Sequence, residues 1–431
     1  MWSLSAPLVS QKLSGGDTER LALVDGSQLE GGGQILRNAA ALACITSVPV
    51  RVHSVRSGRD NPGLRPQHLT GLQLIAALCN GTLDGGAVGS SDVTLRPGAL
   101  LAVRVSPAPS GTLRQRADLH LSRHVPLQGE HTADTRTAGS ITLLAQSALP
   151  CMLFSRGDGP CMLHLKGGTD TNMAPPVDYL LHVLLPTLRS QLGVQITASL
   201  QRRGFYPKGG GALTLTATPV DREAGVPPLE LVARGKVKAV RGIVFVAGTI
   251  PPAVGQRMAD AARAALLAAG VDDVSPECVS LGTVVHEARD TAFGDGCGIT
   301  LVAETDTGCL LGASALGERG KRAEEVGRGV ALELGAALKS GACVDAHLAD
   351  QLVIFMALAG HGTARMLAPA PLSLHARTAI AVAGQMTTAK FTVLEAGEPG
   401  ADDGRPGTVH VQPGTCLVMC HGTAAETGPA T

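Results

Sequence analysis

The feature that most constrains the fold of this chain is a recurring order of short strand, glycine-rich turn and apolar helix. It first runs from strand-like residues 21–24 through Gly31-Gly32-Gly33 to a helical apolar run at 35–43. The order recurs at three further places, which are residues 50–78, 137–149 and 176–192. Strands that alternate with helices predict helices packed on sheets, and the recurrence predicts an α/β unit used about three times.

The predicted core is aliphatic, because aromatic residues make up 2% of the chain while apolar residues make up 44%. That apolar content excludes wholesale disorder, and 431 residues can bury a core without disulfides or metals. The ten cysteines form no Cys-x-x-Cys pair, which argues against zinc and for a reduced, intracellular protein. No apolar run reaches the roughly 18 residues of a membrane span, and residues 1–18 do not resemble a secretory signal. The sequence therefore predicts a soluble protein.

A change of composition near residue 219 predicts a smaller α/β domain inserted into a larger one. A loop rich in proline and charge at 219–228 precedes strand-like stretches at 231–237 and 240–246, and an alanine-rich helix covers 259–269. The strand–helix order resumes near Lys321. The predicted divisions are a flexible leader at 1–19, the large catalytic domain at 20–218 and 320–396, the inserted domain at 219–319, and a loop, terminal strand (408–411) and tail at 397–431.

Residues 30–37, Glu-Gly-Gly-Gly-Gln-Ile-Leu-Arg, form the first candidate anion site. Glycines at a helix start let backbone N–H groups approach a phosphate, and the positive end of the helix favours its negative charge. The motif is neither a Walker A loop nor a Rossmann fingerprint. A tight turn with a surface arginine is the alternative interpretation, and the pattern leaves both open.

A second candidate is a cluster of basic residues at 56–68, which holds three arginines, a glutamine and a histidine. Basic and acidic residues number 36 each, which excludes a generally basic nucleic-acid coat but not a local cluster. Arginine forks bind phosphate oxygens in bidentate fashion. The alternative is a loop whose charges face water. We favour an anion site because the cluster follows closely on residues 30–37.

A polar edge on a predicted helix at 345–352 is the third candidate. His347, Asp350 and Gln351 share one face, since they stand three and four residues apart. This edge could hold a metal, a nucleotide or water, or it could be the capped start of a helix. Two glycine-rich turns with basic residues, at 166–170 and 203–211, are weaker candidates.

Six motifs in the right order resemble those of the RNA 3′-terminal phosphate cyclase family, and most of all its eukaryotic members. The resemblance runs from about residue 21 to residue 391. The motifs are residues 30–37, 56–69, 137–146, 166–175, 204–211 and 350–357.

The resemblance implies a large domain of three α/β repeats with a smaller inserted domain, and a nuclear location. It implies a ligase reaction on RNA that ends in a 3′-phosphate, with ATP as AMP donor and Mg²⁺ or Mn²⁺. A histidine attacks the α-phosphorus of ATP and becomes adenylylated, and AMP then passes to the 3′-phosphate. The adjacent 2′-hydroxyl expels AMP and closes a 2′,3′-cyclic phosphate.

The resemblance also assigns roles to individual residues. His375 stands at the position of the nucleophile, and an imidazole suits that role because it is nucleophilic and neutral near pH 7. Glu30 matches a metal-associated carboxylate. The ATP-binding positions correspond to Gln146, His347, Leu348, Ala349, Asp350 and Gln351. The positions around the phosphates and the RNA correspond to Arg37, Arg56, Arg59, Gln67 and His68. The chain departs from the family at His347, where tyrosine is frequent, and at Asn61, where some members have lysine.

Three other functions stand beside this one. A non-catalytic, cyclase-like protein of ribosome assembly keeps the fold but lacks the nucleophile, so His375 argues against it. A small-molecule transferase of repeated α/β units, similar to enolpyruvyl transferases, would form no covalent nucleotide. A pure RNA-binding module is disfavoured by the zero net charge and the few aromatic residues. The physiological RNA and the oligomeric state stay open.

Overall fold

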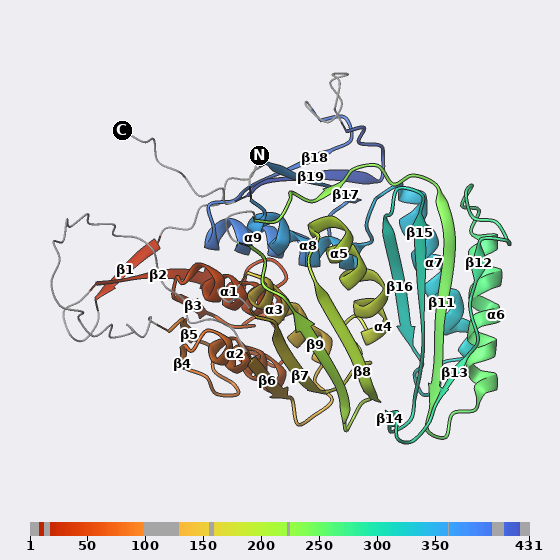
Figure 1. Cartoon of the computed structure of the whole chain (residues 1–431), viewed down its shortest axis with the longest axis horizontal. Helices are drawn as coiled ribbons and strands as arrows, with labels where there is room; N and C mark the ends of the chain where they lie inside the picture. The colour runs from red at the N-terminus through yellow and green to blue at the C-terminus, as the bar shows by residue number, and fades with distance from the viewer. Residues whose placement is uncertain are drawn as a thin grey trace.

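Three β-α-β-α-β-β units of one topology form the larger part of the protein (Figure 1). In each unit the strands lie across the sheet in the order first, second, fourth, third, and the first two strands are parallel. The computed structural model describes residues 8–12, 18–98, 129–154, 159–221, 225–360, 362–398 and 409–422. The predicted fold class, repeated α/β units with helices packed on sheets, is confirmed.

The first unit contains α1, which begins at the glycine-rich turn of residues 31–33, and α2, which begins within the basic cluster of residues 56–68. Its elements are β2 (Thr18–Asp25), α1 (Gly33–Thr46), β3 (Val50–His53), α2 (Pro66–Leu78), β4 (Thr82–Asp84) and β5 (Val93–Arg96). Strand β1 (Leu8–Lys12), within the predicted leader, pairs antiparallel with β2.

The second unit repeats this order with a longer second helix. Its elements are β6 (Gly129–Asp134), α3 (Ile141–Leu153), β7 (Cys161–Gly167), the helical run of α4 (Val177–Tyr179), η1 (Leu180–Leu184) and α5 (Leu185–Leu192), then β8 (Ile196–Gly204) and β9 (Gly211–Ala217). The third unit consists of β10 (Glu230–Leu231), α8 (Ala346–Leu358), β17 (Thr363–Pro369), α9 (Leu374–Met386), β18 (Lys390–Glu395) and β19 (Thr415–His421).

A further sheet lies in the chain between β10 and α8. Its strands are β11 (Val237–Ala247), β12 (Val279–Ser280), β13 (Val285–Glu287), β15 (Gly296–Thr305) and β16 (Leu310–Leu316). The same stretch of chain contains the helices α6 (Pro252–Ala268) and α7 (Ala323–Ser340). Helices α6 and α7 pack against each other and against this sheet (Figure 1). The short strand β14 (Ala292–Phe293) instead pairs with β8 of the second unit. The predicted domain boundaries stay a prediction, although α7, expected in the second part of the large domain, packs on α6.

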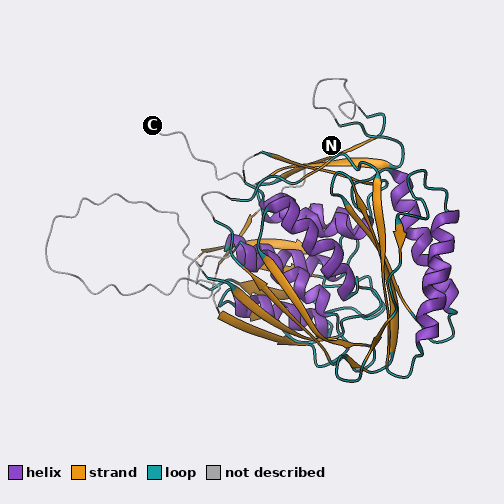
Figure 2. Cartoon of the chain, turned by 45° about the vertical axis from the view of Figure 1, so that its right-hand side comes forward, coloured by secondary structure: helices purple, strands orange, loops and turns teal. Residues whose placement is uncertain are grey.

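The helices of the three units gather in the middle of the protein, with the sheets outside them (Figure 2). Helix α1 contacts α2, α3 and α9, and α8 contacts α3 and α9. The buried side chains between them are mainly alanine, leucine, isoleucine and valine, as the composition predicted. Because α2 and α9 both contact α1, the first turns of these three helices can meet in one place. None of the helices in the described ranges is long and apolar enough to cross a membrane.

Two strand predictions are wrong. The expected strand at 231–237 is interrupted, because Gly235 takes a left-handed conformation (φ +70°) and turns the chain past Asp306. The expected terminal strand at 408–411 is not a strand at residues 409–411, while Thr408 lies outside the described residues. The strand is β19 instead, whose apolar residues fill the gap between β17 and β18.

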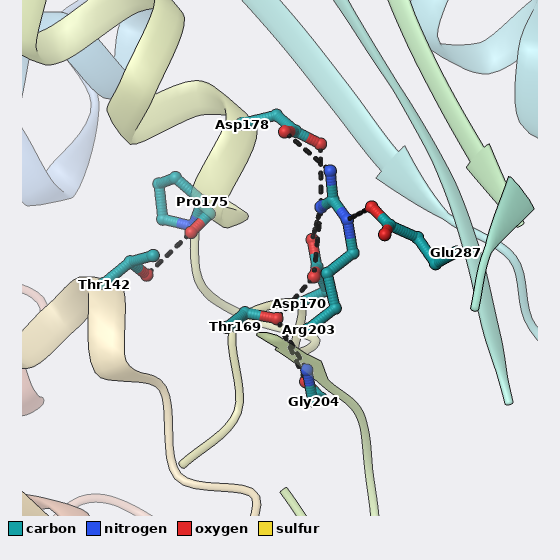
Figure 3. A network of polar contacts seen from close by, with 8 residues as sticks. All are labelled: Thr142, Thr169, Asp170, Pro175, Asp178, Arg203, Gly204 and Glu287. Atoms are coloured by element: carbon teal, nitrogen blue, oxygen red, sulfur yellow. Dashed lines mark hydrogen bonds and ion pairs between the residues drawn. The ribbon is translucent and has the colours of Figure 1, made fainter. Parts of the chain in front are cut away.

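Arg203, near the end of β8, joins the second unit to the further sheet (Figure 3). Its guanidinium donates to Asp178 of α4 at 2.9 and 3.0 Å and to Glu287 of β13 at 2.8 Å, and it lies 3.4 Å from Asp170. The ring of Phe245 in β11 packs against it, with its centroid 4.0 Å from the guanidinium carbon. Arg203 is 5% exposed, so this cluster of charges is buried and extensively hydrogen-bonded.

Candidate functional site

The glycine-rich turn folds the carboxylate of Glu30 over the start of α1. Gly32 is the N-cap of α1, and a Cβ at this position would overlap that carboxylate, so the arrangement requires glycine. One oxygen, Oε1, accepts a hydrogen bond of 2.5 Å from Arg59. The other, Oε2, is buried and has no hydrogen-bond partner among the described residues. An unpaired buried carboxylate oxygen is costly, which makes this atom a candidate ligand for a cation.

Arg37 and His68 lie directly beside the first residue of α1. A Cβ on Gly33 would lie 2.8 Å from Nε2 of His68 and 2.9 Å from Nη1 of Arg37. Arg37 donates to Gln34, one turn earlier on the same helix, at 2.5 Å. Burial lowers the pKa of His68 to about 3, and the positive charges of Arg37 and two further arginines add to this effect. His68 is therefore a neutral imidazole at pH 7, and the positive charge here comes from arginine.

His375 lies in the first turn of α9, where its side chain is exposed. Ser373 caps this helix by accepting from the N–H of Ala376 at 3.1 Å. Protein atoms around the ring displace part of its water and so lower the pKa of His375, and Glu30 partly offsets this lowering. The ring is thus neutral at pH 7, with a lone pair available for attack.

The buried hydroxyl of Thr378 connects α9 to the glycine-rich turn. It accepts from the N–H of Glu30 at 3.2 Å and donates to the carbonyl of Leu374 at 2.7 Å. This contact brings the first turn of α9 to the start of α1, which already touches the first turn of α2 through His68. Three helix N-termini therefore meet around Glu30 and Gly33, and each favours negative charge.

A cleft extends from this meeting point between α1, α3 and α8. The volume that a water-sized molecule can enter is about 20 Å³, the cleft is open to solvent, and its lining comprises Gln34, Arg37, Asn38, Gln146, Leu149, Leu184, Asp350, Gln351, Ile354 and Phe355. The amide of Gln146 donates to Gln351 at 2.9 Å, which joins α3 to α8. The lining combines polar and charged groups with apolar ones, which suits a ligand that has both an apolar ring and charged groups.

Asp350 faces Arg37 in this cleft. Burial raises the pKa of Asp350 to about 7, while His347, Arg37 and a hydrogen bond with Gln34 lower it in part. This carboxyl can therefore change its charge near neutral pH. Perturbed carboxyl groups in a cleft are frequent at functional sites.

Other residues of the predicted site are engaged in packing or in binding the backbone. Arg56 donates to the carbonyls of Asn61 and Gly63, at 2.7 and 3.2 Å, and so braces its own loop. Gln67 accepts from the N–H of Ser140 at 3.1 Å, which joins α2 to the start of α3. The side chains of Leu348 and Ala349 are buried, so a ligand in the cleft would meet other atoms of α8.

His347 lies at the rim, in the first turn of α8, and is exposed. Its ring packs edge-on against Tyr179, with 6.0 Å between the centroids. Asp345 caps α8 by accepting from the N–H groups of His347 and Leu348, and it also accepts from the Tyr179 hydroxyl at 2.7 Å. The prediction of a capped helix start is confirmed here, and the ring of His347 is left accessible.

Sequence reasoning missed two residues of this region. Asn38 lines the cleft, and its signal was available, because it continues the polar edge of Gln34 and Arg37 on an otherwise apolar helix. Thr378 gave no signal, since its partner Glu30 is 348 residues away. In the described parts of the chain no three His, Cys, Asp or Glu side chains group as a metal site. A cation here would have Glu30 as its principal protein ligand.

Comparison with known proteins gives one family over nearly the whole chain. A profile described as RNA 3′-terminal phosphate cyclase matches residues 28–393. A Drosophila melanogaster protein of that description is 37% identical over 408 residues, which is 94% of this chain and 98% of the relative. A Pyrobaculum neutrophilum protein of the same description is 38% identical over 374 residues, 87% of this chain and 95% of the relative. A Dictyostelium discoideum protein described as a probable RNA 3′-terminal phosphate cyclase is 36% identical over 402 residues, 93% and 82% of the two chains. The resemblance predicted from the motifs is confirmed.

Proposed function

The chain belongs to the RNA 3′-terminal phosphate cyclase family, and from this premise we propose that it closes RNA 3′-phosphates into 2′,3′-cyclic phosphates with ATP. In the first step a nitrogen of His375 bonds to the α-phosphorus of ATP, and pyrophosphate leaves. In the second, the nitrogen–phosphorus bond breaks as an oxygen of the RNA 3′-phosphate takes the AMP. In the third, the 2′-hydroxyl attacks the 3′-phosphorus, AMP leaves, and the hydroxyl proton passes to solvent.

The observation that carries the proposal is the meeting of three helix N-termini, two arginines and an exposed neutral histidine at one end of a cleft. Such a place favours a polyphosphate, because the helix ends and the guanidinium groups of Arg37 and Arg59 oppose its negative charge. The transition state of phosphoryl or nucleotidyl transfer is rich in charge, and positioned cations stabilise it. His375 is close enough to this charge for Arg37 and Arg59 to lower its pKa.

The neutral state of His375 supports its role as the nucleophile. Only the unprotonated imidazole has a free lone pair, and the loss of part of the ring's hydration together with the nearby arginines holds the pKa of His375 below its ordinary value. His375 lies in the first turn of α9, so the positive end of this helix would stabilise the phosphate of an AMP bonded to the ring. Thr378 positions this turn against Glu30.

The unpaired Oε2 of Glu30 fits a magnesium or manganese ion. Mg²⁺ is usually held by one or two carboxylates together with substrate phosphates, which agrees with a site that has a single carboxylate. When bound, the ion would neutralise part of the phosphate charge. Arg59 holds the other oxygen of Glu30 and so orients the carboxylate.

The decisive experiment is incubation with α-labelled ATP and Mg²⁺, followed by a search for an acid-labile protein–AMP adduct. We expect the wild type to carry label and His375→Ala to carry none, while His286→Ala, an exposed histidine of β13, serves as the control. Circular dichroism should be unchanged, because His375 is exposed. Label that persists on the His375→Ala protein would overturn the assignment. A wild type that never takes label would favour a non-catalytic relative or a small-molecule transferase.

A panel of 3′ ends tests the substrate. An RNA 3′-phosphate supplies both the phosphate that accepts AMP and the hydroxyl that closes the ring. A DNA 3′-phosphate should accept AMP without cyclising, and a 3′-hydroxyl end should do neither. Turnover of 3′-hydroxyl ends would contradict the proposal. We also propose a nuclear location, which a fluorescent fusion would test.

A further inference from the structure

The exposed aromatic side chains of the described chain gather at one place, the end of the β8–β9 hairpin. Tyr206 at the turn is 82% exposed, and Phe293 in β14 is 41% exposed. No other phenylalanine or tyrosine in the described ranges is exposed. In a chain with two tyrosines and six phenylalanines, two rings open to solvent on neighbouring strands require an explanation.

Gly210 and Arg202 of the hairpin hold the ring of Phe293 at the surface. Gly210 has φ +75°, and a Cβ there would overlap the ring of Phe293, so that ring packs closely on the turn. Arg202 donates to the carbonyl of Gly210 at 2.7 Å and also lies over Phe293, 5.5 Å from the ring centroid. The ring of Phe293 is therefore held by contacts with Gly210 and Arg202.

Positive charge accompanies the rings. Lys208 is exposed on the same turn, and Arg136 is exposed one residue before Thr137, which the turn contacts at Gly209. Neither side chain forms an ion pair with any described residue. The carboxylate of the nearby Asp134 accepts from the backbone N–H of Arg136 at 2.7 Å, so one negative charge lies beside this part of the surface.

The hairpin end is continuous with the candidate site. Gly209 packs against Thr137 and Ala138, and a Cβ there would overlap the carbonyl of Thr137. The same segment continues to Gly139, which packs against Gln67, and to Ser140, which donates to Gln67. Gln67 precedes His68 in the first turn of α2, and the ring of His68 lies beside Gly33 at the start of α1. A strand whose 3′ end lies in the site can therefore follow residues 137–140 to the hairpin.

We infer that Arg202, Tyr206, Lys208 and Phe293, here called the hairpin surface, bind the RNA strand upstream of its 3′ end. The inference rests on the proposed function for the direction of the strand. Bases stack on Tyr206 and Phe293, and phosphates bind Lys208, as in other proteins that hold single strands without reading sequence. The hairpin surface thus gives affinity that grows with RNA length, whereas Arg37 and Arg59 bind the terminal phosphate.

The test measures binding of a 3′-phosphorylated trinucleotide and of longer single-stranded RNAs by fluorescence anisotropy, at two salt concentrations. We expect Tyr206→Ala to raise the Kd of the longer RNAs about tenfold and to leave that of the trinucleotide unchanged. Tyr206→Phe, which keeps the ring, should bind as the wild type does. Lys208→Ala should reduce the slope of log Kd against log salt concentration by about one phosphate contact. Lys390→Ala, at an exposed position of β18, should leave this slope unchanged.

Labelling with α-labelled ATP, done in parallel without RNA, separates this inference from the proposed function. The Tyr206→Ala protein should take label as the wild type does. Unchanged affinity for long RNAs in Tyr206→Ala, or an equal loss for the trinucleotide, would overturn the hairpin surface. If the wild type takes no label and yet Tyr206→Ala weakens long-RNA binding, the hairpin surface stands and the proposed reaction fails.

Discussion

The protein contains two clusters of charge that differ in how completely their atoms are bonded. Around Arg203, three carboxylates surround one guanidinium within hydrogen-bond distance, and the hydroxyl of Thr169 donates to Asp170 at 2.6 Å (Figure 3). Around Gly33, Arg37 has one hydrogen bond within the described chain, to Gln34, and one oxygen of Glu30 has none. The first cluster is saturated by the protein itself, and the second still has groups to offer a ligand.

This difference separates a cluster that maintains the fold from one that binds. Arg203 connects β8, α4 and β13. Its guanidinium bonds to carboxylates of α4 and β13 that water would otherwise solvate, and so it joins the second unit to the further sheet. At the start of α1, Gln34 and Arg37 line the cleft and the neighbouring Oε2 of Glu30 is unpaired, which costs free energy unless a ligand bonds to that oxygen. Burial of charge does not by itself indicate function. The number of unsatisfied atoms beside an opening is the better indicator.

The largest expected effect comes from Arg203→Met. Loss of the guanidinium leaves Asp178 and Glu287 without their cation in a buried place, and breaking a buried pair costs about 3–5 kcal/mol. We expect this loss in the free energy of unfolding, measured by urea titration. Arg51→Met removes a pair with Asp92 that is 40% exposed and should cost at most about 1 kcal/mol. Equal costs for the two variants would contradict the difference between the clusters.

The second effect, at Arg37→Met, should fall on activity. Removing a group that stabilises developing charge lowers the rate by about 10²–10³, and we expect this loss in adenylylation by ATP. Stability should change little, because Arg37 has one hydrogen bond, to a neighbour on its own helix. A urea midpoint lowered as far as in Arg203→Met would place Arg37 among the groups that maintain the fold.

The local parts of both clusters were predictable from the sequence, and the long-range parts were not. The glycines of residues 31–33 predicted the start of α1, because chain flexibility and helix geometry act over a few residues. The contact of Thr378 with Glu30 and the pairing of β8 with β14 depend on how distant segments pack, which no spacing encodes. Arg203 was noticed as a basic residue in a glycine-rich turn, but its three carboxylates come from three separate segments.

A third, smaller effect concerns pH. The folded-state pKa of Asp350 is about 7, above its ordinary value near 4, so in that window the folded protein binds a proton that the unfolded chain has lost. This contribution to stability is therefore present at low pH and is lost as pH rises through about 7. Each pH unit in the window changes the free energy by at most about 1.4 kcal/mol.

Asp350→Asn tests this prediction, because the amide does not titrate. Between about pH 5 and about pH 8 the urea midpoint should fall more in the wild type than in the variant. His68, whose pKa of about 3 gives a contribution of opposite sign, is common to both proteins and cancels in the difference. Parallel pH profiles for the two proteins would show that Asp350 is ionised throughout.

The smallest expected effect is that of Thr378→Val, which removes a single hydroxyl from the boundary of the unsaturated cluster. That hydroxyl bonds to the helix at Leu374 and to the N–H of Glu30, so valine leaves the latter group without its partner. A hydrogen bond of this kind contributes about 1 kcal/mol to stability.

Thr187→Val is the matched control for this prediction, because the buried hydroxyl of Thr187 bonds to the carbonyl of Val183 in its own helical run. We expect both variants to lose a little stability. Only Thr378→Val should also slow adenylylation, by a few-fold, because the hydrogen bond between Glu30 and α9 is lost. Thr378→Ser should restore the rate. Equal adenylylation rates in the two valine variants would show that the fold holds Glu30 in place without Thr378.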